Sequence, residues 1–492
     1  MEKNIVVINK KTASNTKRIE VNGDIIVPDI KPDIVNIINT NAIAYIYKEE
    51  VSTGRIRVDG NIDTYIVYLA DNGETRSMQT TLSFVETIED TNITEVSIAK
   101  EKVYLENIEA KVLNERKISV KSNLRIKSEV FEKSEIEINN DFEEIENVQK
   151  LKETLNIKSI IGTNKVKTSI KEDISCDSSF DIAEILKTDI EICNLENKIS
   201  YNKVLAKADA KIKIIFLAED GRIGIASSNI PVMSFIDIEK IADTNECNVE
   251  YTIRNMLFKV NSKEMHSISC QIDFEVSVEA YETKTIEVIQ DMYGIKNAID
   301  FTKKDVEVQI SSTTKSEKVN INERVLVEDI LSIYDVGINC KNVKSNKSGN
   351  FQNYECELNL EFYYEADNRN GLNVKKVAIP FITKFEGEEG ELEFEIMKKQ
   401  FTVSNENVDC EVEILVKQSN TNLKKISIIE NVISKELDEE NDYKMYMYFV
   451  KQGDTLWNIA KKFKVSMCDI IKLNNIENPD RINIGDRLYI MR

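Results

Sequence analysis

The sequence predicts a mainly β protein, in which three tandem antiparallel β-sandwich-like domains precede a small domain of two strands and two helices. Three observations lead to this prediction. Apolar and polar residues alternate with a period of two over most of the chain, one motif recurs at a constant interval, and the segment 446–492 changes to helical periodicity. With 492 residues, 41% of them hydrophobic, the chain can bury several separate cores.

The motif that recurs is D-I-x-x-I. It starts at Asp33, Asp181 and Asp329, so both intervals are 148 residues. A strand that ends in a polar turn recurs at the same interval, at 68–72, 216–220 and 364–368. A looser third landmark is an apolar closing strand at 118–126, 268–274 and 408–414. Two landmarks that share one interval indicate three copies of one domain, and not a solenoid of short repeats.

The copies and their connections define the expected boundaries. Helical periodicity occurs at 145–155 and 286–293, and the acidic stretch before the C-terminal segment has the composition of a solvated linker. We therefore expect five units: a β-domain at 1–140, a second at 141–284 with a helical N-terminal linker, a third at 285–420, an acidic linker at 421–445, and the C-terminal domain at 446–492.

Within each copy the pattern is that of strands with one buried face. Residues 62–68 and 211–216 alternate in this way, and Ala-Asp-Asn-Gly at 70–73 is typical of a hairpin turn. We interpret each D-I-x-x-I element as a short helical turn, capped by its Asp, with both Ile side chains in the core. A contact between neighbouring domains or chains is the alternative interpretation.

The net charge of -20 at pH 7 argues against a nucleic acid or an anionic membrane as partner. Residues 446–492 differ, because they carry eight basic and five acidic side chains, a net charge of +3 that leaves -23 for the rest. No apolar run reaches the length of a membrane span, and the N-terminus does not have the pattern of a targeting segment. We therefore expect a cytosolic protein.

Motifs for catalysis, metal or cofactor binding are missing from the sequence. The eight cysteines are scattered and fit small buried residues better than a disulfide framework or a zinc site. His266, which we expect in a strand of copy two, is the single histidine. No nucleotide-binding, serine-hydrolase or zinc-protease motif occurs. We interpret the acidic cluster at 386–393 as an exposed hairpin loop, with a calcium site as the alternative. The prediction is a protein that is not an enzyme and has no cofactor or metal.

The C-terminal segment has a distinct order of elements. A short apolar strand at 448–450 ends in a Gln-Gly-Asp turn, and either Asp454 or Thr455 can cap the helix that follows. Ser466 is expected to cap a second helix, which Asn474 and Asn475 close, and residues 487–490 form a last strand. This order is strand, helix, helix, strand.

This order, with the sequences QGDTLWNIAKKF, KLNN and INIGDRLYI, resembles the lysin-motif (LysM) family. The resemblance implies a shallow groove between two loops in which N-acetylglucosamine polymers often bind. Carried over to this chain, the groove and its partner contacts comprise Gly453, Asp454, Thr455, Leu456, Trp457, Asn474, Asn475, Ile476 and Pro479. Ile484 departs from the family pattern, since many members have proline there.

The first copy carries V-P-D-I-K-P-D-I at 27–34, YIVYLADNG and NERKISV, and with these it resembles the SPOCS domain of spore-coat-associated proteins. SPOCS-like copies ahead of a lysin motif resemble the spore-coat morphogenetic proteins of endospore-forming bacteria. The resemblance implies a mother-cell adaptor at the forespore surface, whose lysin motif docks the coat scaffold, stage IV sporulation protein A. Self-association through the edges of the acidic copies is a further expectation, and a binder of peptidoglycan or N-acetylglucosamine polymers is the alternative.

Overall fold

The computed structural model describes residues 4–138, 146–177, 181–261, 264–367, 369–436, 444–479 and 481–492. Strands dominate these residues, and the two helices both lie near the C-terminus. The predicted fold class is therefore confirmed. We call residues 4–436 the body and residues 444–492 the tail domain. None of the described helices has the length and apolar character needed to cross a membrane.

Each copy of the repeat consists of two three-stranded antiparallel sheets that pack face to face. The first sheet contains the long opening and closing strands of the copy, and the second contains the hairpin that carries the polar turn. In copy one the first sheet contains β1 (Asn4–Ile26), β6 (Lys117–Ile138) and β5 (Ile98–Asn114). The second sheet contains β2 (Ile34–Ser52), β3 (Arg55–Ala70) and β4 (Thr75–Glu89).

Copies two and three repeat this topology. In copy two the first sheet contains β11 (Glu246–Val260), β12 (Ser267–Gly294) and β7 (Val148–Ser175). The second sheet contains β10 (Ile223–Asp237), β9 (Lys203–Ala218) and β8 (Ile182–Ser200). In copy three the first sheet contains β13 (Asn297–Leu326), β18 (Asn407–Glu436) and β17 (Glu391–Ser404). The second sheet contains β14 (Ile330–Ser348), β15 (Phe351–Ala366) and β16 (Arg369–Glu386). The predicted closing strands are parts of β6, β12 and β18, and their apolar residues are buried.

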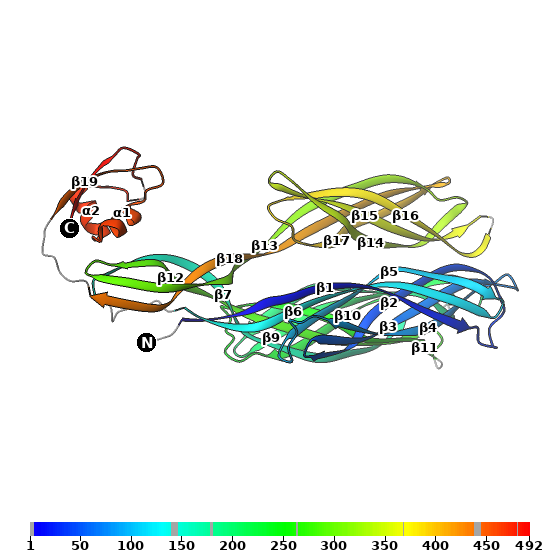
Figure 1. Cartoon of the computed structure of the whole chain (residues 1–492). Helices are drawn as coiled ribbons and strands as arrows, with labels where there is room; N and C mark the ends of the chain where they lie inside the picture. Colours follow the sequence, from blue (N-terminus) through cyan, green and yellow to red (C-terminus); the bar gives the residue numbers. More distant parts are fainter. Residues whose placement is uncertain are drawn as a thin grey trace.

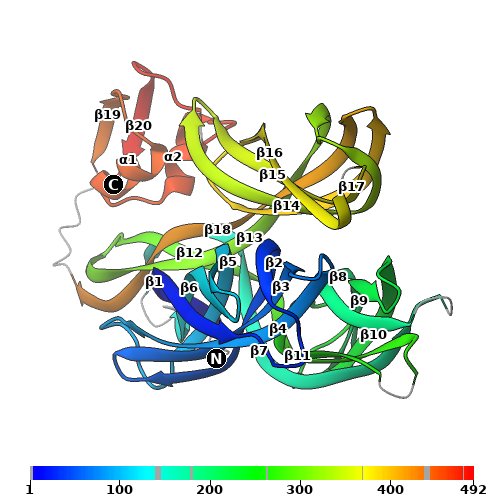
Figure 2. The same ribbon diagram turned by 90° about the vertical axis from the view of Figure 1, so that its right-hand side faces the viewer.

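The three copies close into a ring and do not extend as a row (Figure 2). Strand β4 of copy one packs on β8 of copy two, β10 of copy two packs on β14 of copy three, and β16 of copy three returns to β2 of copy one. Because β2, β8 and β14 are equivalent strands, as are β4, β10 and β16, every junction uses the same pair of elements. The body therefore has an approximate threefold axis.

Apolar residues from all three copies meet on this axis. Their positions keep the repeat interval: Ile38, Leu186 and Tyr334 form one set, and Val67, Ile215 and Tyr363 form a second. The sequence predicted strands with one buried face, but the outward face of β3 and β9 is also buried here. It is buried because it packs against the neighbouring copies, a contact that the alternation within one copy does not reveal.

A polar network surrounds these apolar residues. Asn39, Lys187 and Asp335 occupy equivalent positions, and each is at most 7% exposed. Asn39 Nδ2 donates to Glu361 Oε1 of copy three at 3.1 Å, and Lys187 Nζ lies 3.8 Å from Glu361 Oε2. Lys213 of copy two forms an ion pair with Asp335 of copy three. Each position thus carries a different polar group that pairs with a group on another copy.

The interpretation of D-I-x-x-I as a helical turn is wrong. The motif starts β2, β8 and β14, and the strand register shifts on both sides of its second isoleucine in every copy. Such bulges add a residue to one strand, so two Ile side chains three residues apart can enter the same core. The Asp carbonyl accepts a backbone hydrogen bond from the polar turn, as between Asp33 and Asp71 at 2.9 Å. The two sequence landmarks therefore meet in space.

The helices predicted at 145–155 and 286–293 are also wrong. Strand β7 starts at Val148, and β12 continues to Gly294 with a register shift between Ile289 and Asp291. This shift makes the apolar spacing resemble that of a helix. The boundary expected between 284 and 285 falls inside β12, and the one between 140 and 141 lies outside the described residues. Strand β18 occupies the expected acidic linker as far as Glu436, and the remainder, 437–443, is not among the described residues.

The long strands form an arm that all three copies share. The arm buries residues from β1, β6, β7, β12, β13 and β18 in one cluster: Val6, Ile136, Ile138, Leu155, Ile157, Ile286, Val288, Val308, Ile426 and Ile428. The strand pairs β7–β12 of copy two and β13–β18 of copy three continue past this cluster towards the tail domain (Figure 1). This second region of contact holds the ring together at the end opposite to the polar turns.

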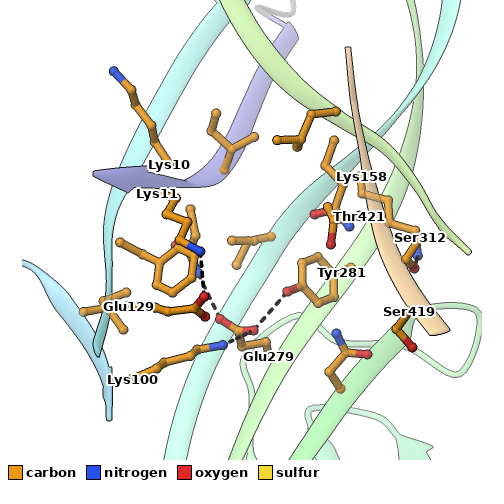
Figure 3. Close-up of a pocket in the computed structure, with 18 of the residues that line it drawn as sticks. Lys10, Lys11, Lys100, Glu129, Lys158, Glu279, Tyr281, Ser312, Ser419 and Thr421 are labelled. Atoms are coloured by element: carbon orange, nitrogen blue, oxygen red, sulfur yellow. Dashed lines mark hydrogen bonds and ion pairs between the residues drawn. The ribbon is translucent and has the colours of Figure 1, made fainter. Parts of the chain in front are cut away.

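Between the arm and the apolar axis lies a cavity of about 2760 Å³, lined by all three copies. Its charged side chains largely pair with one another, as Figure 3 shows for Lys11 with Glu129 and for Lys100 with Glu279. Residues 387–390 form a loop with exposed acidic side chains that borders the cavity, but it is not the predicted hairpin, because β16 and β17 belong to different sheets. Within the described ranges no group of three His, Cys, Asp or Glu side chains could hold a metal ion.

One carboxyl group at this cavity is not paired with a cation. Glu101 is 6% exposed, and its Oε1 accepts a hydrogen bond from Ser128 Oγ at 2.7 Å, while Oε2 has no partner. Burial raises the pKa of Glu101 to about 7, against a smaller opposite effect of Ser128. Because the pKa of Glu101 is higher in the folded state, its protonation stabilises the fold. This stabilisation is complete below the ordinary pKa and is lost as the pH rises through about 7.

Lys187→Met should destabilise the body by about 3 kcal/mol, because it leaves Asp189 and Glu361 without a buried cation on the axis. Equilibrium denaturation measures this free energy. Lys211→Met removes a lysine of the same copy whose 4.0 Å ion pair with Glu191 is exposed, so it should cost less than about 0.5 kcal/mol. Equal effects of the two substitutions would contradict the role of the axis.

Glu101→Gln should stabilise the protein by up to about 3 kcal/mol at pH 8 and by less than about 1 kcal/mol at pH 5, because the amide removes only the cost of ionisation. Denaturation at a series of pH values tests this. Glu109→Gln, on an exposed part of the same strand, serves as the control and should shift stability little at either pH. A gain of the same size at both pH values would exclude ionisation as the cause.

Candidate functional site

The tail domain contains the predicted elements in the predicted order. They are β19 (Met445–Phe449), α1 (Leu456–Phe463), α2 (Met467–Asn474) and β20 (Arg487–Met491), and the two strands pair antiparallel. The core between the helices and the sheet comprises Val450, Leu456, Ile459, Ala460, Val465, Ile470, Leu488 and Ile490. Helices of eight residues are too short to be stable alone, so this small core holds them in place.

The loop between β19 and α1 is fixed by two polar side chains. Thr455 caps α1, with its Oγ1 accepting from the backbone N–H of Asn458 at 3.1 Å. Asp454 has a different role, since its Oδ2 accepts from Lys451 N–H and from Tyr448 Oη, both at 2.8 Å. These bonds lower the pKa of Asp454 below its ordinary value, because they favour the carboxylate. Of the two candidate caps, the structure selects Thr455.

The second loop starts at the end of α2. Asn475 ends the helix with a left-handed backbone, a conformation that Asn tolerates better than most residues. Asn474 pairs with β20, because its Nδ2 donates to Tyr489 O and its Oδ1 accepts from Tyr489 N–H. This contact covers the outer edge of β20 as a third strand would. The predicted capping role of Ser466 is not realised by its side chain.

The two loops lie side by side. Val450 N–H donates to Asp486 O at 3.0 Å, and Gly485 N–H donates to Val450 O at 2.9 Å. Gly453, Thr455 and Asn475 are exposed, Ile476 and Pro479 are half-buried, and Leu456 belongs to the core. Exposed backbone and polar groups at the tips and partly covered apolar groups between them form a surface that can bind an extended polar ligand.

Trp457 faces the body and not the exposed loops. Its Nε1 donates to Asp291 Oδ2 at 2.8 Å, and its ring packs edge-on against Tyr293 with 4.9 Å between centroids. Lys461, one turn later on α1, also pairs with Asp291, at 2.7 Å, and Tyr293 Oη donates to Val465 O. Trp457 is 8% exposed. The tryptophan that we predicted to contact a partner thus joins the tail domain to the end of β12.

This junction is electrostatic as well as apolar. Burial alone would raise the pKa of Asp291, but the hydrogen bonds from Lys461 and Trp457 outweigh it and hold the pKa below the ordinary value. The junction is therefore fully formed at neutral pH, and its charged part is lost only when the pH falls through that lowered pKa. No sequence pattern pointed to Asp291, since only the folded arm brings it to Trp457.

The remaining candidates from the sequence have structural roles. His266 lies in the turn before β12, where its Nδ1 is 3.4 Å from Asp181 Oδ1, and not inside a strand as expected. The equivalent pair in copy one is Arg116 and Asp33, at 2.8 Å. All eight cysteines are free thiols, and burial raises the pKa of Cys270 to about 12. Cys270, Cys356 and Cys410 are buried, but Cys468 is exposed and the other four are partly covered, so the expectation of buried cysteines is right for only three of the eight.

Comparisons with known proteins support both resemblances. The LysM domain model matches residues 448–490, which is the tail domain almost from end to end. The model described as SipL, SPOCS domain matches residues 181–261, which include β8 to β11 of copy two. The match falls on the second copy, although the sequence landmarks of this domain were clearest in the first. LysM and SPOCS domains are binding domains and not catalytic ones.

Curated relatives match over short segments only. The secreted LysM effector ECP6 of Passalora fulva is 49% identical over 43 residues, the endolysin of Bacillus phage B103 is 39% identical over 59, and the N-acetylmuramoyl-L-alanine amidase XlyA of Bacillus subtilis (strain 168) is 46% identical over 43. These segments are 9%, 12% and 9% of this chain, and the chain covers 19%, 22% and 14% of the three relatives.

Lys461→Ala should loosen the junction, because Asp291 then loses its ion pair with Lys461, while its hydrogen bond to Trp457 Nε1 remains. The emission of the single tryptophan should shift to longer wavelength as the indole meets water. Lys462→Ala is the matched control, since Lys462 lies over Tyr448 within the tail domain. Unchanged emission in both Lys461→Ala and Asp291→Ala would contradict the docked position of Trp457.

Proposed function

We propose that this chain is a non-enzymatic morphogenetic adaptor of the spore coat, whose LysM groove docks a coat scaffold protein of the stage IV sporulation protein A type. The observation that carries the proposal is the orientation of the tail domain. The buried side chain of Trp457 binds the body through Asp291, while the loops with Gly453, Thr455 and Asn475 stay exposed. A body that holds these exposed loops in one orientation would suit an adaptor that binds its partner there.

Charge supports a protein partner that is distinct from the body. The tail domain is basic within a strongly acidic chain, so the two parts can bind partners of different charge. The SPOCS match supports a role in sporulation, and the proposed location is the mother-cell cytoplasm at the forespore surface. We propose no catalytic activity, because both matched domains are of the binding type.

The alternative function is binding of peptidoglycan or another N-acetylglucosamine polymer. One finding favours it: two relatives that match short segments of this chain are named as an endolysin and an N-acetylmuramoyl-L-alanine amidase. Calorimetric titration of the whole chain with N-acetylglucosamine oligomers, and separately with the scaffold protein, distinguishes the two. Tryptophan fluorescence is unsuitable for this titration, because Trp457 lies at the junction with the body.

Gly453→Asn should abolish or weaken scaffold binding by at least tenfold without unfolding the tail domain. Gly453 has φ +85°, which Asn tolerates, and an added Cβ would meet nothing within 4 Å, so the new side chain enters the mouth of the groove. Gly221→Asn is a matched control, with the same φ and equally open space on the body. Surface plasmon resonance on immobilised scaffold protein measures the change.

If Gly453→Asn and Gly221→Asn bind the scaffold equally well, the groove is not the docking site. If Gly453→Asn leaves scaffold binding intact but removes oligosaccharide binding, the groove is a glycan site, and the alternative function replaces the proposed one. Thermal unfolding of both variants confirms that the comparison concerns folded proteins.

A further inference from the structure

The two-stranded sheet of the tail domain has an uncovered apolar face. Its core-facing residues pack on the helices, whereas Met445, Met447, Phe449, Tyr489 and Met491 all point outward and are each at least 37% exposed. They form cross-strand pairs, Met445 with Met491 and Met447 with Tyr489, so they make one continuous patch. We call this patch the tail face. Monomeric proteins rarely leave such a patch on a regular element without a partner.

The charged residues in and next to the two strands of the tail face are mainly positive, with Asp486 before β20 as the acidic neighbour. Arg487 pairs across the sheet with Phe449, and Lys444 and Arg492 flank the ends of the strands. Neither β19 nor β20 contains an Asp or Glu. The surface that covers the tail face must therefore offer apolar side chains among carboxylates. Two tail faces stacked on each other would place these cations together, which disfavours a symmetric pair.

The opposite end of the same molecule has this complementary character. At the ends of β1 and β13 and the starts of β2 and β14, five apolar side chains are more than half exposed: Ile26, Ile30, Val35, Leu326 and Leu331. We call them the far-end face. Exposed acidic residues lie among and beside them, including Asp29, Asp71, Glu328 and Asp367. The cations here are already paired, as Lys31 is with Glu184 and Arg116 is with Asp33.

The direction of the strands places these two faces at opposite ends. The tail domain docks at Asp291 and Tyr293, near the start of β13, while Leu326 is the last residue of that strand. A strand of 30 residues spans roughly 100 Å at about 3.3 Å per residue, and Figure 1 shows the tail domain at one end of the long body. One chain cannot bring its own two faces together while the junction is closed.

We propose that the tail face of one chain binds the far-end face of a second copy, so that the protein assembles head to tail. Such a contact is heterologous and leaves a free face at each end, so it adds further copies instead of closing a dimer. Five apolar side chains on each side make a small interface, so the association is weak and depends on protein concentration. Its charged rim makes it stronger at low salt.

The test uses sedimentation velocity of the full chain and two double variants. Wild type should form a concentration-dependent series of oligomers at low salt. Met447→Glu with Phe449→Glu removes the tail face, and Ile30→Lys with Leu331→Lys removes the far-end face, so each variant alone should be a monomer. Mixed in equal amounts they should give a dimer and nothing larger, because each retains the face that the other lacks.

Phe351→Glu is the matched control, since Phe351 is a similarly exposed aromatic on β15 away from both ends, and it should assemble as wild type does. A wild type that stays monomeric at every concentration would overturn the proposal. So would a dimer of the far-end variant alone, because that would mean that tail faces pair with each other. Gly453→Asn should assemble normally, which keeps this test separate from that of the groove.

Discussion

The closure of three copies around one axis is the constraint on which the rest of the structure depends. Apolar residues at equivalent positions meet there, and the buried Asn39, Lys187 and Asp335 around them each find a partner on another copy. A homotrimer would place three identical groups at this site. Because the three copies within one chain have different sequences, equivalent positions carry different side chains. A cation of one copy can therefore face an anion of another, whereas three identical charges would repel each other. This difference fixes which copy neighbours which.

The same closure determines where the tail domain can bind. The strand pairs β7–β12 and β13–β18 are long enough to extend beyond the ring together, and β12 brings Asp291 and Tyr293 to Trp457 and Lys461. The side of α1 that carries Trp457 and Lys461 therefore packs on the body and is not open to other molecules. The exposed loops and the outer face of the tail sheet remain accessible to other partners. The body is thus more than a stalk, because it sets the direction in which the tail domain is presented.

Much of this fold could be predicted from the sequence, because the interval of 148 residues and the period of two reflect local structure. The positions of the two tail helices followed from Thr455, Asn474 and Asn475, which act within a few residues of themselves. The D-I-x-x-I element and the strand through 286–293 were misread, because a bulge imitates helical spacing. The partner of Trp457 could not be predicted, because Asp291 is 166 residues away and no local pattern marks it.

Small-angle X-ray scattering of the whole chain tests the central claim most directly. A closed ring with a docked tail domain gives a single-peaked distance distribution, with a longest dimension set by the strand of 30 residues, roughly 100 Å, plus the tail domain. Three separate domains in a row would give several peaks and a much longer particle. That second result would contradict the axis, the shared arm and the fixed orientation of the groove together.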